Sequence, residues 1–500
     1  MFKISLYKNI AKASFWSFLS EIVAKTLGPL LFLVMTMLLS PKDFGLVAVA
    51  TTILGLLMVI SDMGMSKVII QESGDEEYLD QLNNVAFWFN IVMGMLVFLV
   101  LFLFSTPIAK LYGEPAASAI LQVMSLQVIF FAFSSIQSAI KKKYLDFKSL
   151  FYIRLVTVCT PALVSVPLAF MGVGFWAIVW GNVLGSLATA IILWKNSVWK
   201  PRFYFNFIIL KYIFSKGIWS TFESLIVWVP ILLDTFLITK YLSSSNLGLY
   251  ITSRNLFTVA VGVFLGPLIP ILFSSLSIIK NDLAAMKRAV LFSQKMIFAV
   301  SAMMGVFVFI FRDIIEKLVF TDDWDGLGQI VGILFLVLGF EYFCSSIIEG
   351  FRAKGKFKIL ALNVLVCTVI SIPILFYAAQ FSLISYVIVR TLLLFIQFPV
   401  FIFYSPQILG LRWLDYLTNT KHSLWIVLSL LALNSFLVFF GVREEIKYFA
   451  LLAAFIYALY LLIAIEKTSF LKIMEHVNFR KVLAKFNWRK GGHEKSEKNS

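Results

Sequence analysis

The sequence contains little of the chemistry that most enzymes and metalloproteins use. Only three cysteines and three histidines occur among 500 residues, and charged residues make up 14% of the chain. The cysteines, Cys159, Cys344 and Cys367, lie far apart in apolar stretches, and no CxxC pair or histidine cluster is present. This pattern argues against a disulfide framework and offers no metal-ligand set, so we expect no metal site and no cofactor.

Apolar residues are abundant and make up 60% of the chain. About 20 mostly apolar residues cross the ~30 Å hydrocarbon core of a bilayer, and the backbone must be helical there because lipid offers it no hydrogen-bond partner. Stretches of this length follow one another through most of the sequence, which predicts an all-α polytopic membrane protein with fourteen transmembrane helices. The predicted spans are 14–40, 44–66, 83–107, 116–140, 149–171, 174–195, 217–240, 247–273, 288–311, 327–350, 359–380, 383–404, 423–441 and 446–465.

Lysine and arginine are distributed unevenly between alternate loops. Loops that stay in the cytoplasm carry an excess of these residues, and with both termini inside, most of the 43 Lys and Arg residues fall on the inner side. The outer loops then carry Lys42, Lys110, Lys240, Arg312, Lys317, Arg443 and Lys447. The segment 71–81 is acidic and nominally inside, but acidic residues contribute little to orientation. We therefore predict that both termini are cytoplasmic.

The net charge of +16 does not indicate a nucleic-acid partner, because the basic residues lie at the membrane edges and not on one face of a soluble domain. In the tail, residues 470–488 have apolar side chains at helical spacing with Lys and Arg between them. Such a helix suits the surface of an anionic leaflet, so membrane lipids are the expected partner of the tail.

The chain repeats itself weakly. The segment LSPKDFGLV at 39–47 resembles LSSSNLGLY at 242–250, and FKSL at 147–150 resembles FKIL at 357–360. The first pair follows predicted spans 1 and 7, and the second follows spans 4 and 10, so each repeat is six helices long and the two lobes run parallel. Paired lobes of this kind are typical of alternating-access transporters. The expected divisions are an N-terminal lobe at 1–216, a C-terminal lobe at 217–410, two additional helices at 411–465 and a basic cytoplasmic tail at 466–500.

Four cations fall inside predicted spans, and three of them, Lys25, Arg254 and Arg390, are candidates for a cavity site, whereas Lys295 lies level with a carboxylate across a hairpin. A charge at the bilayer centre costs about 2.5–3.5 kcal/mol on insertion scales, so it must be paired or face water. Arg390 has no obvious partner in the sequence, whereas Asp234 and Arg254 should lie at similar depth in one hairpin. A salt bridge that only locks helices together stays open for that pair. We expect the three cations to line a cavity that receives an anionic substrate.

Carboxylates also fall inside the spans. Glu21, Glu223 and Asp234 lie on the first helix of each lobe and are candidates for ion coupling or gating, because desolvation favours proton uptake by a carboxylate. Glu223 is the preferred candidate, since Lys25 lies one turn from Glu21 and Arg254 lies level with Asp234. The coupling ion is expected to be a proton or Na⁺. Lys295 and Glu341 are level across another hairpin and form a candidate structural ion pair.

Four segments together resemble the bacterial polysaccharide-export flippases, the O-antigen and exopolysaccharide branch of the multidrug/oligosaccharidyl-lipid/polysaccharide exporter superfamily. These segments are SPKDFGLVA after the first span, SDMGMSKVIIQ at 61–71, MGVGFWAIVWGNVLG at 171–185 and DTFLITKYLSSSNLGLYITSR at 234–254. The resemblance covers most of residues 14–410. It implies a fold like that of the multidrug and toxin extrusion antiporters, with two extra helices at the C-terminus.

The resemblance also implies a function. A flippase of this branch moves an undecaprenyl-diphosphate-linked oligosaccharide across the inner membrane for lipopolysaccharide or exopolysaccharide synthesis, without catalysing a reaction. It would act as a monomer beside the proteins that assemble the polysaccharide. One alternative within the superfamily is a multidrug antiporter or a lipid II flippase. The lipid II flippases carry arginines in the first span, where this chain has Glu21 and Lys25.

A membrane polysaccharide polymerase or ligase is the alternative from another class. Such an enzyme needs a sizeable outer loop and catalytic groups near the outer face. The longest predicted outer loop, near 311–327, is short and acidic and contains no histidine. The sequence therefore favours a transporter.

Overall fold

The computed structural model describes residues 25–476, without residues 198 and 267, together with residues 16, 19, 20 and 23. Every regular element among them is a helix. An apolar helix at Lys25–Leu38 is followed by thirteen helical segments that are long and apolar enough to cross a membrane. Each predicted span overlaps one of these segments, which confirms the all-α polytopic fold.

Each of the thirteen segments consists of one helix or of two or three consecutive helices. They are α2 (Pro41–Asp62), α4 (Glu76–Leu111), α5 (Ala117–Met124) with α6 (Leu126–Lys143), α7 (Phe147–Phe170), α8 (Trp176–Lys195), α9 (Phe207–Tyr241), α10 (Ser244–Phe264), α12 (Leu283–Val319), α13 (Leu327–Leu336) with α14 (Leu338–Phe343) and α15 (Ser345–Ala353), α16 (Phe357–Ala378), α17 (Leu383–Leu392) with α18 (Phe398–Ile408), α19 (Trp413–Phe439), and α20 (Glu444–His476). Shorter elements are α3 (Met65–Gln71), α11 (Leu268–Ile278), η1 (Asp322–Trp324) and η2 (Leu393–Gln397).

Several helices begin earlier than hydropathy predicts, and α4 shows why. The Asp75 side chain accepts a hydrogen bond from the Tyr78 backbone N–H, and Glu76 and Glu77 occupy the first turn. Acidic groups are favourable at the positive end of a helix. The acidic segment 71–81 therefore contains the polar start of α4, which hydropathy alone reads as a loop.

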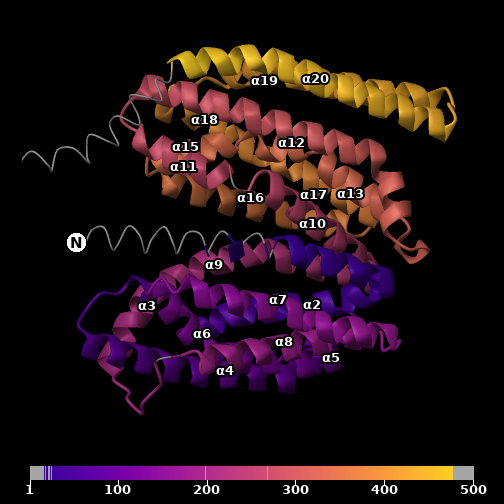
Figure 1. Ribbon diagram of the computed structural model, residues 1–500. Coiled ribbons are helices and arrows are strands. Elements are labelled where there is room, and N and C mark those ends of the chain that lie inside the picture. Colours follow the sequence, from indigo (N-terminus) through magenta and orange to yellow (C-terminus); the bar gives the residue numbers. More distant parts are fainter. Residues whose placement is uncertain are drawn as a thin grey trace, which may run out of the picture.

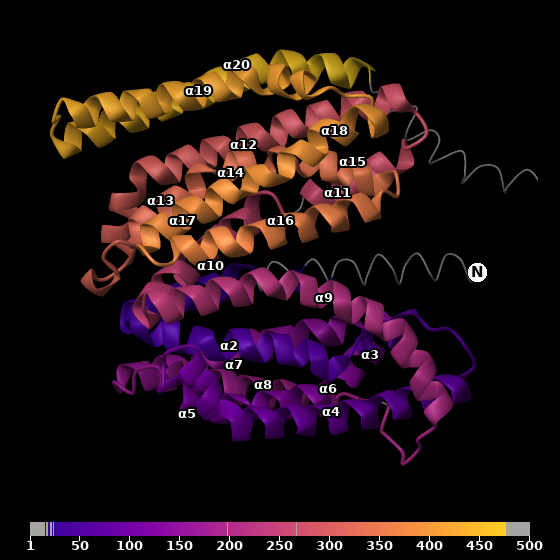
Figure 2. The same ribbon diagram turned by 180° about the vertical axis from the view of Figure 1, so that it is seen from behind.

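Figures 1 and 2 show two bundles joined at one end of the molecule. The first lobe contains α2–α8, the second contains α10–α18, and α19 and α20 pack along α12 at the edge of the second lobe. Helix α9 belongs to both lobes, because it packs against α3 and α4 and also against α10 and α16. The predicted division at residue 217 thus falls inside α9.

The turns that precede α2 and α10 lie at the joined end of the molecule, here named the closed end. Ser40 caps α2 in a capping box with Asp43, and the Asp43 carboxylate also accepts a hydrogen bond of 3.0 Å from the Phe175 backbone N–H. Ser243 caps α10 by accepting from the Asn246 backbone N–H. Two segments that look like family motifs in the sequence, SPKDFG and GVGFWA, are therefore held together by one aspartate.

The two repeated segments contact each other at the closed end in a reciprocal way. A Cβ atom at Gly45 would collide with the carbonyl oxygen of Ser244, and a Cβ atom at Gly248 would collide with the carbonyl oxygen of Pro41. Pro41 and Ser244 are the first residues of α2 and α10. The internal repeat thus places one glycine of each lobe against the backbone of the other.

Buried side chains continue this junction. One hydrophobic cluster at the closed end contains residues of both lobes, including Leu46, Val49, Leu247 and Tyr250. Trp324 is fully buried there, and its indole N–H donates a hydrogen bond of 2.7 Å to the carbonyl oxygen of Thr36. Among the described residues, the other large clusters lie within one lobe together with the helices attached to it. The lobes are therefore packed together at the closed end.

We predict that Gly248→Ala weakens this junction. The added methyl group must displace the α2 backbone, and overpacking of this kind costs typically about 1–3 kcal/mol. Thermal unfolding of the purified protein in detergent measures the change. Gly28→Ala is the matched control, because a Cβ atom at Gly28 meets nothing within 4 Å. Equal unfolding temperatures for Gly248→Ala and Gly28→Ala would contradict the close contact.

Candidate functional site

A buried polar cluster lies in the second lobe, where α9, α10 and α17 meet. The Asp234 carboxylate of α9 accepts hydrogen bonds from the Tyr386 hydroxyl at 2.6 Å and from the Tyr250 hydroxyl at 2.8 Å. It also accepts from the Nε of Arg390, with distances of 3.2 and 3.3 Å to its two oxygens. Asp234 is 6% exposed, so this carboxylate is buried with one cation and two hydroxyl donors as its partners.

This cluster corrects one prediction from the sequence. Arg390 has a partner, and the cation that pairs with Asp234 is Arg390 of α17, not Arg254. The sequence showed that Asp234 and Arg254 lie at similar depth, but depth does not determine which side chains face each other. The two tyrosines were missed altogether, because a tyrosine in an apolar span carries no charge that marks it.

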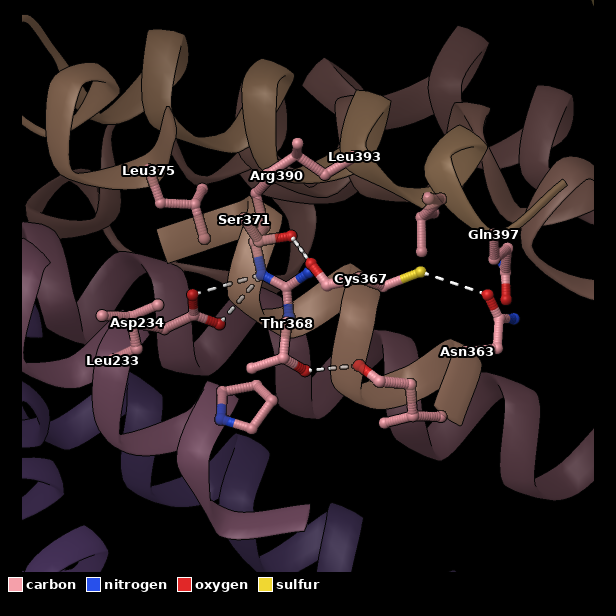
Figure 3. Close-up of a pocket in the computed structure, with 13 residues that line it drawn as sticks. Leu233, Asp234, Asn363, Cys367, Thr368, Ser371, Leu375, Arg390, Leu393 and Gln397 are labelled. Atoms are coloured by element: carbon pink, nitrogen blue, oxygen red, sulfur yellow. Dashed lines mark hydrogen bonds and ion pairs between the residues drawn. The ribbon is translucent and has the colours of Figure 1, made fainter. Parts of the chain in front are cut away.

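The Arg390 side chain reaches a cavity of about 150 Å³ between α9, α16 and α17. Figure 3 shows the guanidinium between Asp234 and the hydroxyl side chains of Thr368 and Ser371, with Asn363 and Gln397 further along the wall. The Nε of Arg390 donates its hydrogen bond to Asp234. The two Nη groups of Arg390 donate no hydrogen bond to a described residue. A guanidinium has five N–H donors, so the Nη edge is free to bind a second anion.

Arg254 and Glu341 belong to the same region of the second lobe. The cations whose charges act on Glu341 are Arg254 and Arg390, and both also act on Tyr250. The Arg254 guanidinium lies 5.8 Å from the centre of the Phe257 ring on its own helix, in the range of a cation–π contact. Two arginines and two carboxylates thus share one low-dielectric region, where charges interact strongly.

The predicted structural pair of Lys295 and Glu341 is replaced by this arrangement. That pair is not among the ion pairs between described residues, and Glu341 instead lies in the field of two arginines from α10 and α17. Lys295 and Glu341 lie level with each other across a hairpin in the sequence, but equal depth does not determine which side chains meet. Helices α10 and α17 pack against α13, and the charges of their arginines, Arg254 and Arg390, act on Glu341.

Lys25 links the first described helix to the second lobe. Its Nζ donates a hydrogen bond of 3.3 Å to the carbonyl oxygen of Gly262 on α10. Gly262 lies two helical turns from Arg254 along α10, which is about 12 Å at 1.5 Å per residue. Lys25 therefore contacts α10 about two turns away from Arg254, and a site shared by the two cations stays a prediction.

The three carboxylates predicted from the sequence to couple transport to an ion differ in burial and in partners. Glu223, the preferred candidate because it has the fewest partners in the sequence, is exposed on α9. Asp234 is buried but fully occupied by Arg390 and two tyrosines. Glu21 lies outside the described residues.

Comparison with known proteins places the chain among membrane exporters. A family described as "Polysaccharide biosynthesis protein" matches residues 34–327. The succinoglycan biosynthesis transport protein ExoT of Rhizobium meliloti (strain 1021) is 24% identical over 362 residues, which cover 71% of each chain. The lipopolysaccharide biosynthesis protein WzxC of Escherichia coli (strain K12) is 22% identical over 343 residues, covering 67% of this chain and 68% of that protein.

Solved structures show the same fold. The inward closed conformation of the lipid II flippase MurJ superposes with a TM-score of 0.72 at 16% identity, covering 92% of this chain and 100% of that one. An inward-facing multidrug resistance transporter of the MATE family gives a TM-score of 0.54 at 11% identity, covering 83% of this chain and 95% of that one. These likenesses confirm the predicted architecture. Because the family match covers more than half of its length, this chain belongs to the polysaccharide biosynthesis protein family.

Proposed function

We propose that this protein is a flippase that moves a polyprenyl-diphosphate-linked oligosaccharide across the bacterial inner membrane by alternating access. The chain is a multi-pass membrane transporter of polysaccharide biosynthesis and not an enzyme. The lipid-linked oligosaccharide is supported as the substrate by Arg390. Its Nε is held by Asp234, while its Nη edge faces a cavity within the transmembrane region. The relatives named for succinoglycan and lipopolysaccharide biosynthesis agree with a lipid-linked glycan as cargo.

The diphosphate is the part of such a substrate that this site can recognise. Arginine binds phosphate through two parallel N–H donors, and the interaction is strengthened where water is excluded. Arg390 offers its Nη edge, and Arg254 lies close enough for both charges to act on Glu341. Asp234 compensates the charge of Arg390 through a direct ion pair, and Glu341 lies near enough for the charges of both arginines to act on it.

Alternating access agrees with the arrangement of the lobes. They are packed together at the closed end, and the contact rests on two glycines and one shared hydrophobic cluster. With both termini in the cytoplasm, as the basic loops favour, the closed end faces the periplasm. Opening that end would release the glycan on the outer side. The work would come from a proton or sodium gradient.

We expect Arg254→Gln and Arg390→Lys to impair binding of a polyprenyl diphosphate. Arg254→Gln removes a charge, whereas Arg390→Lys keeps the charge that compensates Asp234 but removes the planar fork of donors. Breaking a buried charge–phosphate contact costs typically about 2–5 kcal/mol, or at least tenfold in affinity. The measurement is binding of undecaprenyl diphosphate to purified protein, with undecaprenol as the uncharged comparison ligand.

Arg312→Gln is the control for this series, because Arg312 pairs with its neighbour Asp313 at the end of α12. It should bind the diphosphate as the unaltered protein does. Wild-type affinity in both Arg254→Gln and Arg390→Lys would exclude these arginines from the substrate site. A site that binds undecaprenol as tightly as the diphosphate would reject recognition of the phosphates.

Cysteine labelling tests the orientation. In a variant with Cys159, Cys344 and Cys367 replaced by serine, we expect Asp323→Cys to react with a membrane-impermeant maleimide in intact spheroplasts. Lys356→Cys should react only after permeabilisation. Both positions are exposed in the structure, so a failure to react reports on the membrane and not on burial. The reverse pattern would invert the topology.

A further inference from the structure

A helix is interrupted within the first lobe, where α2 ends at Asp62 and α3 begins at Met65. The two residues between them, Met63 and Gly64, have left-handed φ values of 43° and 74°. Interrupted helices in membrane proteins are found where their ends line an ion or substrate site, because the carbonyl oxygens at a helix C-terminus are free to coordinate a cation. The break between α2 and α3 is therefore a candidate ligand site.

Within the described part of the chain, the groups that donate hydrogen bonds to the Asp62 carboxylate at this break are all neutral. The Ser66 hydroxyl donates to it at 2.5 Å and the Ser66 backbone N–H at 3.4 Å. The Asn90 amide of α4 donates to it at 3.2 Å and to the Ser135 hydroxyl of α6 at 3.0 Å. Residues of α3 and α4 thus contact the Asp62 carboxylate, α6 is linked to it through Asn90, and none of these groups is positively charged.

Two further polar atoms in the same region have no hydrogen-bond partner among the residues that the structure describes. The Oδ1 atom of Asn90 and the Oγ atom of Ser61 are buried and unpartnered, and each residue is 1% exposed. Buried acceptors without a partner are uncommon and costly, which makes each of them a sign of something that completes it. The amide nitrogen of the same Asn90 side chain donates to Asp62, so this unpartnered oxygen belongs to the polar cluster around the carboxylate.

Negative charge predominates around the end of α2. The last turn of α2 contains no basic residue, and the C-terminal end of a helix is its negative end. Lys67 on α3 is the charged side chain that acts on Asp62, but it is exposed and its Nζ donates to the Ser224 hydroxyl at 3.4 Å. Asp62 forms no ion pair with a described residue. Asp62 is half-buried, and a carboxylate partly withdrawn from water without a paired cation is stabilised by a bound cation or a proton that balances its charge.

We propose that Asp62, Asn90 and Ser61 form a binding site for a small monovalent cation, either Na⁺ or a proton carried by the Asp62 carboxylate. Oxygen atoms of a carboxylate, an amide and a hydroxyl are the ligands that a hard cation takes. Asp62 is thus the ion-coupling candidate within the transmembrane region, in place of Glu223.

The position of the break connects this site to the joint between the lobes. Gly64 packs so closely on α9 that a Cβ atom there would collide with the carbonyl oxygen of Gly217, and a Cβ atom at Gly217 would collide with that of Met63. A cation that changes the geometry of the break therefore acts directly on α9. This coupling role rests on the proposed transport function, whereas the binding of the cation does not.

The competing explanation is purely structural. In that case Asp62 only orders the break through Ser66 and Asn90, and no cation binds. The two explanations differ in their response to cations, because a ligand that binds the folded state raises its stability in proportion to its occupancy.

The test is thermal unfolding of the purified full-length protein in detergent, titrated with NaCl against choline chloride at constant ionic strength and repeated across pH 5–8. We expect the unaltered protein to be stabilised by Na⁺, or to show a pH dependence without a Na⁺ effect, which identifies a proton. Asp62→Asn should abolish whichever response is found. Identical Na⁺ and pH responses in Asp62→Asn and the unaltered protein would overturn the proposal.

Two further variants make the result specific. Asp146→Asn is the control, since Asp146 is a carboxylate of the first lobe that already has a cation, Lys141 at 3.2 Å, and its loss should leave the Na⁺ response unchanged. Ser61→Ala removes only one oxygen and keeps Asp62, so it serves if Asp62→Asn fails to fold. It should raise the half-saturating Na⁺ concentration, or shift the midpoint of the pH response, by several-fold. A response identical to that of the unaltered protein would exclude Ser61 and overturn the three-residue site.

These measurements need no glycan, so they remain valid if the proposed substrate is wrong. The coupling role is tested separately in reconstituted vesicles, where flipping of the lipid-linked glycan should depend on an imposed gradient in Asp146→Asn but not in Asp62→Asn. Equal gradient dependence in both variants would leave a cation site that does not drive transport, and would reject the coupling role.

Discussion

The contact between α2 and α10 at Gly45 and Gly248 is the constraint on which the arrangement of the lobes depends. Each glycine faces the first carbonyl group of the other helix, so the two backbones approach more closely than any side chain would allow. Without a strong hydrophobic driving force between helices in lipid, small residues that permit close packing are the main source of helix association. The contact is local and reciprocal, which makes it suitable as a junction that separates and reforms without unfolding either lobe.

Charges in the second lobe follow from the same low-dielectric surroundings. Asp234 does not stand alone in the membrane, because Arg390 and two tyrosine hydroxyls satisfy it. Holding Arg390 through Nε leaves the opposite edge of the guanidinium directed at the cavity. A buried ion pair adds little net stability when desolvation is counted. Its value here is that it fixes a cation in a position where a phosphate can reach it.

The helices could be predicted well from the sequence, because each span corresponds to a continuous run of apolar residues. The sequence also predicted that the 39–47 and 242–250 segments correspond, though not that they touch. Side-chain partners were predicted less well. Arg390 looked unpaired because its partner is 156 positions away on another helix, and no periodicity reports such a distance. Asp62 was passed over because it lies at the end of an apolar run, where a carboxylate reads as the edge of the membrane.

Helix α9 reaches both the α2–α3 break and the polar cluster around Asp234. Its N-terminal part contacts the α2–α3 break through Gly217, and its C-terminal part carries Asp234. These two residues are about 25 Å apart along the helix at 1.5 Å per residue, so the proposed cation site and the proposed phosphate site act on opposite ends of one element. Pro230 lies between them and removes a backbone hydrogen bond, which allows the two parts of α9 to bend relative to each other. A cation that alters the break would therefore change the angle of α9 and, with it, the position of Asp234 relative to Arg390. Such a linkage requires no extended chain of contacts, since a single helix reaches both sites.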